Sequence, residues 1–287
     1  MNDKFKDNLK YYTSVINKYI ESIKYTDIYA NKLYESMEYS MSGGKKIRPI
    51  LILATYNLFK DNLNECLPYC MSMEMIHNFS LIHDDMPCID NDDLRHNKLT
   101  NHKKYGEYTA LLAGDMLLNK AYENILCLDS FNSYALKELS IGTSNMIKGE
   151  YIDIIFENTD ISYDQLKYMH LNKTGALIRA SVRIGAILAN CNNNELNILT
   201  KFGEDIGLAF QIKDDILSKI GDSKKTGKPV GNDEELTKST YIKIVGLDKS
   251  INLLDNIIKN AIDSLKVFGN KANFLIDLAI YIKEREK

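Results

Sequence analysis

The sequence of 287 residues predicts an all-α fold in a single domain that spans residues 1–287. Apolar residues recur at spacings of three and four along most of the chain, which is the period of amphipathic helices. Leu, Ile, Lys and Glu are plentiful while Gly and Pro are sparse, a balance that favours helix over sheet. No segment shows sustained strand alternation and no Ser/Pro/Gly-rich linker divides the chain. We therefore expect one globular helical bundle.

The apolar spacing also predicts where each helix lies. Phe5, Leu9, Tyr12 and Ile16 mark the first one. The expected helices span 5–23, 27–39, 48–59, 64–86, 107–128, 132–151, 163–190, 194–220, 239–246, 248–268 and 271–285. The connections predicted between them are Ser42-Gly43-Gly44, a polar irregular segment over 87–104, and a Gly- and Lys-rich loop over 221–237. Lys173-Thr174-Gly175 interrupts the long helical pattern of 163–190.

Composition excludes several classes of protein. A net charge of −3 excludes a general binder of polyanions such as nucleic acid. The five cysteines are odd in number and form no CxxC pair, which favours a reducing, cytoplasmic setting. The N-terminus has no apolar signal core, and no apolar run approaches the roughly 20 residues of a membrane-spanning helix. We expect a cytoplasmic protein without membrane insertion.

An acidic segment begins at the end of the fourth predicted helix and contains five aspartates, Asp84, Asp85, Asp90, Asp92 and Asp93. Carboxylates packed this tightly repel one another, and those at a helix C-terminus also oppose the helix dipole. Mg²⁺ prefers hard oxygen ligands and is usually held by carboxylates together with substrate phosphates. We expect the first three to bind Mg²⁺ against a diphosphate and the last two to position the loop. A solvated acidic cap is the alternative, and it predicts no second aspartate pair.

Such a second pair exists. Gln211, Asp214 and Asp215 stand at i, i+3 and i+4, on a single face of a predicted helix. Alone, this aspartate pair would be interpreted as two exposed residues on a helix surface. Together with Asp84 and Asp85 it predicts two halves of one metal site that face each other across the bundle.

Basic residues offer a matching surface for phosphates. Lys45 and Arg48 follow two glycines and lie three residues apart, where Arg can bind phosphate in a bidentate way and Lys as a point charge. A solvated basic helix start is the alternative. Four further cations complete the polar set, although each Lys taken singly is more often exposed: Arg95, Lys173, Lys228 and Lys238. His77 taken singly is more often a core histidine, and we interpret Arg179 and Arg183 as structural ion-pair partners.

These residues, in this order, resemble one family almost from end to end. The matching segments are Gly43-Gly44-Lys45-Lys46-Ile47-Arg48-Pro49, Ser80 to Pro87, Asp92-Asp93-Leu94-Arg95, Leu112-Ala113-Gly114-Asp115, Lys173-Thr174-Gly175, Gly207 to Gln211, Gly227-Lys228 and Lys238-Ser239-Thr240-Tyr241. The chain resembles the trans-isoprenyl diphosphate synthases, and within them the short-chain bacterial farnesyl diphosphate synthase type. The resemblance implies a helical bundle around a deep central cavity, usually a homodimer.

The resemblance also implies a role for each matching residue. It assigns Mg²⁺, as three ions with substrate bound and with Mn²⁺ as a substitute, to Asp84, Asp85, Asp90, Asp214 and Asp215. It assigns the allylic diphosphate to Arg95, Lys173, Lys228 and Lys238, and the diphosphate of isopentenyl diphosphate to Lys45, Arg48 and His77. Thr174 and Gln211, with Lys173, would assist the allylic cation.

Product length is expected to follow the floor of the cavity, near Phe79 and Ser80. Phe79 lies five positions before Asp84, about 7.5 Å along a helix. A bulky aromatic residue there, together with the inserted Pro87-Cys88, resembles the bacterial farnesyl synthases. We therefore expect a C15 product.

Four residues depart from the family pattern. His96 stands where a second arginine normally binds isopentenyl diphosphate, so this contact should be weaker or pH-dependent. Ser218 replaces the last Asp of the second motif, Glu150 replaces a common Gln, and Asn172 a frequent His. Three alternatives stay open: a geranylgeranyl or geranyl diphosphate synthase, a non-catalytic regulatory subunit, and an HD-type phosphohydrolase based on His83-Asp84.

Overall fold

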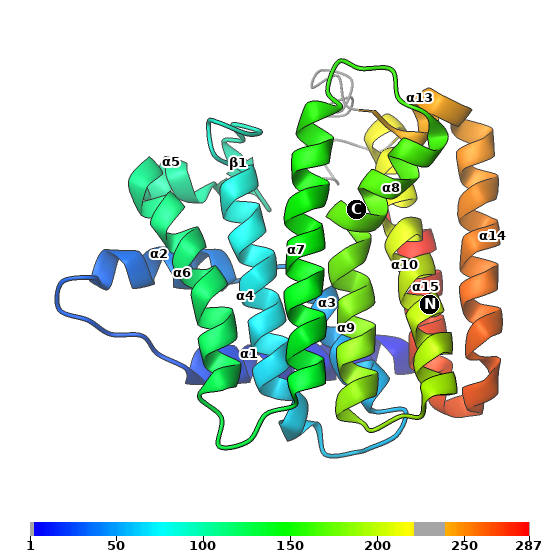
Figure 1. Ribbon diagram of the computed structural model, residues 1–287, viewed down its shortest axis with the longest axis horizontal. Helices are drawn as coiled ribbons and strands as arrows, with labels where there is room; N and C mark the ends of the chain where they lie inside the picture. The colour runs from blue at the N-terminus through cyan, green and yellow to red at the C-terminus, as the bar shows by residue number, and fades with distance from the viewer. Residues whose placement is uncertain (1–2, 221–238, 287) are drawn as a thin grey trace.

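Long helices stand side by side in the computed structural model, which describes residues 3–220 and 239–286 (Figure 1). The all-α prediction is confirmed. The α-helices are α1 (Asp3–Ser22), α2 (Asn31–Met41), α3 (Ile47–Tyr56), α4 (Leu67–Asp84), α5 (Asn101–Tyr105), α6 (Glu107–Leu126), α7 (Ser133–Ile155), α8 (Tyr163–Lys173), α9 (Gly175–Leu188), α10 (Asn193–Ile220), α13 (Tyr241–Val245), α14 (Leu247–Leu265) and α15 (Asn273–Glu284). Two 3₁₀ helices, η1 (Leu63–Cys66) and η2 (Lys266–Ala272), and two short strands, β1 (Leu94–Arg95) and β2 (Lys98–Leu99), join them.

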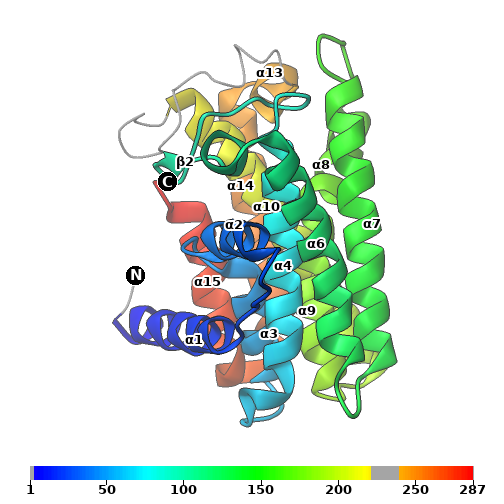
Figure 2. The same cartoon turned by 90° about the vertical axis from the view of Figure 1, so that its left-hand side faces the viewer.

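The core runs along α4 and α9, which are buried on most sides. Helix α4 packs chiefly against α6, and α9 packs against α3, α7 and α10. Helix α1 crosses the bundle near one end, while the β-hairpin and α13 lie at the other end (Figure 2). The buried side of α1 carries Phe5 and Tyr12, whose rings lie 5.2 and 4.9 Å from that of Phe274. Within the described ranges, no helix is both long and apolar enough to cross a bilayer.

One of the segments expected to be irregular contains a β-hairpin. Residues 94–99, within the predicted polar loop, form an antiparallel hairpin in which Leu94 pairs with Leu99. His96 and Asn97 turn it with φ angles of 51° and 60°, the left-handed pair of a type I′ turn. Strands this short leave no periodic signal. The loop predicted over 221–237 lies outside the described residues, as do Lys228 and Lys238.

Glycines allow two close approaches that place the end of α8 among its neighbours. A Cβ on Gly149 of α7 would lie 2.1 Å from the backbone nitrogen of Lys173. A Cβ on Gly207 of α10 would lie 2.7 Å from the Cα of Gly175. The helical pattern over 163–190 forms two helices, α8 and α9, which separate at Thr174, where the interruption was predicted. This junction therefore lies between α7 and α10, with its polar residues facing both.

Candidate active site

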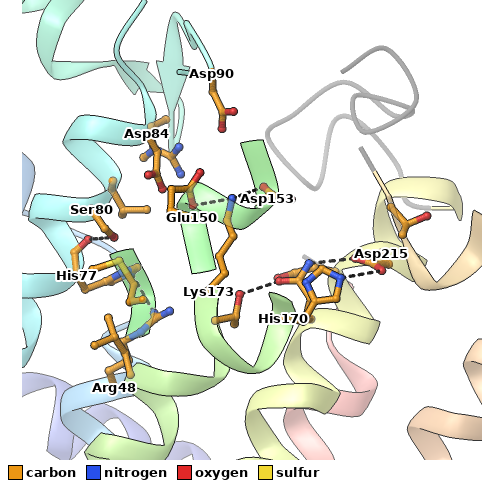
Figure 3. Close-up of a pocket in the computed structure, with 18 of the residues that line it drawn as sticks. Arg48, His77, Ser80, Asp84, Asp90, Glu150, Asp153, His170, Lys173 and Asp215 are labelled. Atoms are coloured by element: carbon orange, nitrogen blue, oxygen red, sulfur yellow. Dashed lines mark hydrogen bonds and ion pairs between the residues drawn. The ribbon is translucent and has the colours of Figure 1, made fainter. Parts of the chain in front are cut away.

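A cavity of about 270 Å³ opens beside the ends of α4, α7, α8 and α10 (Figure 3). Its lining joins residues of both acidic motifs and three of the four predicted Lys and Arg residues that the structure describes. The lining residues are Arg48, His77, Ser80, Leu81, Asp84, Asp90, Arg95, Met146, Glu150, Asp153, His170, Lys173, Thr174, Leu177, Gln211, Asp214, Asp215, Ser239 and Thr240. Four predicted site residues lie within the described chain but outside this lining, namely Lys45, Phe79, Asp85 and His96.

The first acidic motif folds back on itself at the end of α4. Asp84 is the last residue of the helix, and the backbone N–H of Asp90 donates to its carbonyl oxygen at 2.9 Å. The prediction that Asp90 returns towards the pair is confirmed. Both side chains line the cavity. The two carboxylates are thus held near each other by main-chain geometry.

Asp85 was expected to bind metal, but in the structure its carboxylate pairs with Arg95. Its carboxylate accepts from Nε of Arg95 at 2.7 and 2.9 Å and from Nη2 at 2.5 Å. Asp85 is buried, whereas Arg95 lines the cavity. A bidentate pair of this kind fixes the plane of the guanidinium. In this structure Asp85 therefore orients Arg95 towards the cavity and does not itself face it.

Negative charge dominates the lining. Six carboxylates face three side-chain cations there: Asp84, Asp90, Glu150, Asp153, Asp214 and Asp215 against Arg48, Arg95 and Lys173. Burial, and next the charge of Glu150, raise the pKa of Asp84 to about 7. Among the described residues, no three His, Cys, Asp or Glu side chains are grouped closely enough to hold a metal ion by themselves. Any Mg²⁺ that bound to these carboxylates would therefore need oxygens of a bound ligand to complete its coordination.

The second acidic motif is held by a chain of hydrogen bonds. Thr174 Oγ1 donates to Gln211 Oε1 at 2.8 Å, and Gln211 Nε2 donates to Asp215 Oδ1 at 3.0 Å. The backbone N–H of Tyr241 donates to the other carboxylate oxygen of Asp215 at 2.8 Å. Asp215 is thereby fixed in orientation, and the hydroxyl of Thr174 is directed by Gln211 at the break between α8 and α9.

Asp214 has a partner that the sequence did not indicate. Arg285, just after α15, donates from Nη2 to Asp214 Oδ1 at 2.7 Å and to the carbonyl oxygen of Phe210 at 3.0 Å. Its guanidinium also lies 4.0 Å from the centroid of the Phe210 ring. Arg285 is buried, so a residue near the C-terminus orients a carboxylate of the second motif.

Lys173 lies between two carboxylates of α7, as Figure 3 shows. Its Nζ is 2.7 Å from Glu150 Oε2 and 2.6 Å from Asp153 Oδ2. Burial acts to lower the pKa of Lys173, but the charges of Asp153 and Glu150 outweigh it and hold that pKa well above its usual range. Asp153 was not predicted as a site residue, although it stands three positions after Glu150, a spacing that places both on one helix face.

Arg48 and His77 form a separate polar group in the same cavity. Nη1 of Arg48 lies 3.1 Å from Nε2 of His77. Burial, and next the charge of Arg48, hold the pKa of His77 well below its usual range, so the neutral ring accepts this hydrogen bond. Lys45, directly after Gly43 and Gly44, is exposed and outside the lining, and His96 is exposed in the hairpin turn.

The wall below Asp84 shows which face of α4 meets the cavity. Ser80 and Leu81 line it, whereas the ring of Phe79 packs edge-on against that of His83, with 4.9 Å between centroids. The prediction that Phe79 faces the growing chain is therefore not supported by this geometry. His83 Nε2 lies 3.1 Å from the carbonyl oxygen of Leu111 on α6, which removes the basis for an HD-type phosphohydrolase.

The remaining predicted residues have structural contacts. Asn172 is buried and donates to the carbonyl oxygen of Tyr168 at 2.7 Å. Arg183 pairs with Glu138 at 2.7 Å, and Arg179 lies 3.4 Å from Glu204, as expected of structural ion pairs. None of these side chains lines the cavity, nor does that of Ser218.

Comparisons with known proteins find relatives over most of the chain. A family model described as polyprenyl synthetase matches residues 30–271. The farnesyl diphosphate synthase of Micrococcus luteus is 40% identical over 251 residues, which cover 86% of each chain. The chloroplastic heterodimeric geranylgeranyl pyrophosphate synthase large subunit 1 of Arabidopsis thaliana is 41% identical over 259 residues, covering 86% of this chain and 70% of its own.

Solved structures share the fold. An FPP/GFPP synthase from Zymomonas mobilis has a TM-score of 0.87 and 32% identity, covering 99% of this chain and 100% of its own. A geranyltransferase from Helicobacter pylori, complexed with magnesium and isoprenyl diphosphate, has a TM-score of 0.81 and 28% identity, covering 96% of both chains.

Proposed function

The chain belongs to the polyprenyl synthetase family and is a short-chain trans-prenyltransferase, and from this premise we propose that it makes mainly farnesyl diphosphate, the C15 product. It would condense dimethylallyl and then geranyl diphosphate with isopentenyl diphosphate. One observation carries the proposal: Asp84 and Asp90 share a cavity with Asp214 and Asp215, and Lys173 lies in the same lining. Carboxylates for metal and cations for phosphate are what departure of a diphosphate requires.

Mg²⁺ fits the carboxylates of this cavity, with Mn²⁺ as a substitute. Asp84 and Asp90 on one side, with Asp214 and Asp215 on the other, would hold it; the expected number with substrate bound is three ions. When bound, the metal supplies Lewis-acid stabilisation of the departing diphosphate. The excess of carboxylates in the lining and the raised pKa of Asp84 support this assignment.

The protein's own residues would orient the substrates and stabilise charge. Arg95, held by Asp85, and Lys173 would bind the allylic diphosphate as the bond from its C1 to oxygen breaks. The hydroxyl of Thr174 and the amide of Gln211 would face the resulting allylic cation. Isopentenyl diphosphate would bind through Arg48, and its double bond would attack the allylic C1. The departed diphosphate would then take the proton from isopentenyl C2, which forms the new double bond.

The ion pair with Arg285, which directly follows α15, orients the Asp214 carboxylate, a proposed metal ligand. We expect Arg285→Ala to raise the Mg²⁺ concentration for half-maximal activity by about 10- to 100-fold, the cost of losing a group that orients a metal ligand. Lys283→Ala is the matched control, because Lys283 forms an exposed pair with Asp255. A Mg²⁺ titration checks this. Equal titration curves for the two variants would mean that Asp214 needs no positioning by Arg285.

The C15 assignment depends on the wall beneath the first motif. Relatives at similar identity include both farnesyl and geranylgeranyl synthases, so the wall residues of this chain must decide. Ser80 lines the cavity next to Leu81, one helical turn before Asp84. We expect Ser80→Phe to shorten the main product from C15 to C10, because an aromatic ring would occupy the path of the second isoprene unit. Chromatography of dephosphorylated products checks this, with Phe79→Ala for comparison.

A product assay tests the proposed reaction. Purified protein with Mg²⁺, dimethylallyl diphosphate and isopentenyl diphosphate should give farnesol after dephosphorylation. C20 as the main product would support a geranylgeranyl synthase. Absence of any prenyl product would favour a non-catalytic regulatory subunit, for which His96 and Ser218 are the supporting residues; the retained carboxylates argue against it.

The assembly and compartment are also proposals. Exposed apolar side chains gather on α6 and α7, and they include Tyr108, Leu111, Leu112, Leu126, Tyr134, Ile141, Ile147, Tyr151, Ile154 and Ile155. This apolar surface is consistent with a homodimer that buries these helices. All five cysteines are free thiols, consistent with a reducing cytoplasm.

A further inference from the structure

Glu150 and Asp153 both form ion pairs with Lys173 in the cavity. The two carboxylates are one turn apart on α7, and their oxygens lie 2.7 and 2.6 Å from the ammonium nitrogen. The side chains of Glu150 and Asp153 are only 13% and 8% exposed, so water screens these pairs weakly. A cation that should bind diphosphate is thus already neutralised by the protein.

Of the two carboxylates that pair with Lys173, Glu150 is the one that also acts on Asp84. Its second oxygen, Oε1, is buried and has no hydrogen-bond partner among the described residues. Burial is the main cause of the raised pKa of Asp84, and the negative charge of Glu150 is the next. Figure 3 shows Glu150 between Asp84 and Lys173. One carboxylate therefore acts on both Asp84, the proposed metal ligand, and Lys173, the proposed phosphate-binding residue.

Building on the proposed function, we infer that Glu150 is a positioning residue that holds Lys173 through their ion pair and releases it when a divalent cation binds beside Asp84. A cation near Asp84 attracts the unpaired side of the Glu150 carboxylate and weakens its hold on the ammonium group. Lys173 then becomes available to a diphosphate oxygen, with Asp153 as its remaining partner. Binding of the metal and binding of diphosphate are coupled through this one side chain.

The isosteric substitution Glu150→Gln tests the inference through binding alone. Inorganic pyrophosphate binding is measured by calorimetry in EDTA, and Mn²⁺ binding without pyrophosphate by the loss of the free-ion EPR signal. We expect pyrophosphate to bind about tenfold more tightly and Mn²⁺ about tenfold more weakly than in the wild type, within the range of typical coupling energies. Glu157→Gln is the matched control, because it removes the same charge just beyond the end of α7. It should change neither affinity.

Affinities that move in the same direction, or that both stay within twofold of the wild type, would overturn the inference. A residue with only a structural role would not shift the two affinities in opposite directions. If Glu150→Gln does not fold, Glu150→Asp replaces it; this variant should bind pyrophosphate more tightly in EDTA while keeping Mn²⁺ affinity, and unchanged pyrophosphate binding would count against the inference. Because neither measurement needs turnover, absence of prenyl product from the wild type would refute the proposed function separately.

Discussion

We expect Asp84→Asn to lower kcat/KM for prenyl transfer by about 10³-fold, the rate equivalent of losing several kcal/mol of metal-assisted charge stabilisation. Asp84 ends α4 and lines the cavity with Asp90. The substitution keeps the size of the side chain and removes its charge. The residue therefore loses its value as a metal ligand while the shape of the site is preserved.

A stability measurement distinguishes loss of a metal ligand from misfolding as the cause of the lower activity of Asp84→Asn. Asp84 is destabilised by burial and by the charge of Glu150, so in EDTA the variant should be at least as stable as the wild type in urea unfolding. Asp93→Asn is the matched control, because Asp93 lies in the segment that follows α4, is exposed, and pairs with Lys103 at 2.8 Å. It should keep at least half of the activity. Retention of more than a tenth of the activity by Asp84→Asn would show that this carboxylate is not a required ligand.

The second large effect concerns stability. Lys46, at the start of α3, donates to Glu74 Oε1 and to the carbonyl oxygen of Met41, both at 2.8 Å. The two charged side chains are only 2% and 5% exposed. We expect Lys46→Met to lower the free energy of unfolding by about 3–5 kcal/mol, because it leaves the Glu74 carboxylate buried without its cation. Urea unfolding followed by circular dichroism checks this value.

The control for this prediction is an exposed ion pair with the same nitrogen–oxygen distance. Lys283 and Asp255 are also 2.8 Å apart, but their side chains are 42% and 47% exposed. Lys283→Met should therefore cost less than about 1 kcal/mol. The double variant Lys46→Met with Glu74→Leu should recover much of the lost stability, since it removes both charges. Equal effects of the two lysine substitutions would mean that burial does not strengthen the Lys46 pair.

The acidic motifs were predictable because clustered carboxylates have few structural roles, whereas their individual tasks were not. Sequence spacing could not tell that Asp85 binds Arg95 while Asp84 faces the cavity, because neighbouring side chains on a helix differ by about 100° in direction. The same difference separates Ser80, which lines the cavity, from Phe79, which packs on His83. The rotation of a helix about its axis is set by tertiary packing.

Long-range partners left no sequence signal at all. Arg285 is a single arginine far along the chain from Asp214, and only the packing of α15 on α10 brings them together. Helix boundaries were predicted well where apolar periodicity was strong, as in α1 and α10. The break at Thr174 was also predicted, but the close approaches that Gly149 and Gly207 allow beside it were not. Such contacts depend on which helices become neighbours in space.

One measurement tests the central claim most directly. The protein is incubated with geranyl diphosphate and Mg²⁺, with and without isopentenyl diphosphate, and released pyrophosphate is counted against new prenyl product. We predict one pyrophosphate for each C15 diphosphate formed, little release without isopentenyl diphosphate, and none of either product in EDTA. Pyrophosphate or phosphate release at the same rate without isopentenyl diphosphate would show a hydrolase, and no release under any condition would show that the site does not ionise its ligand.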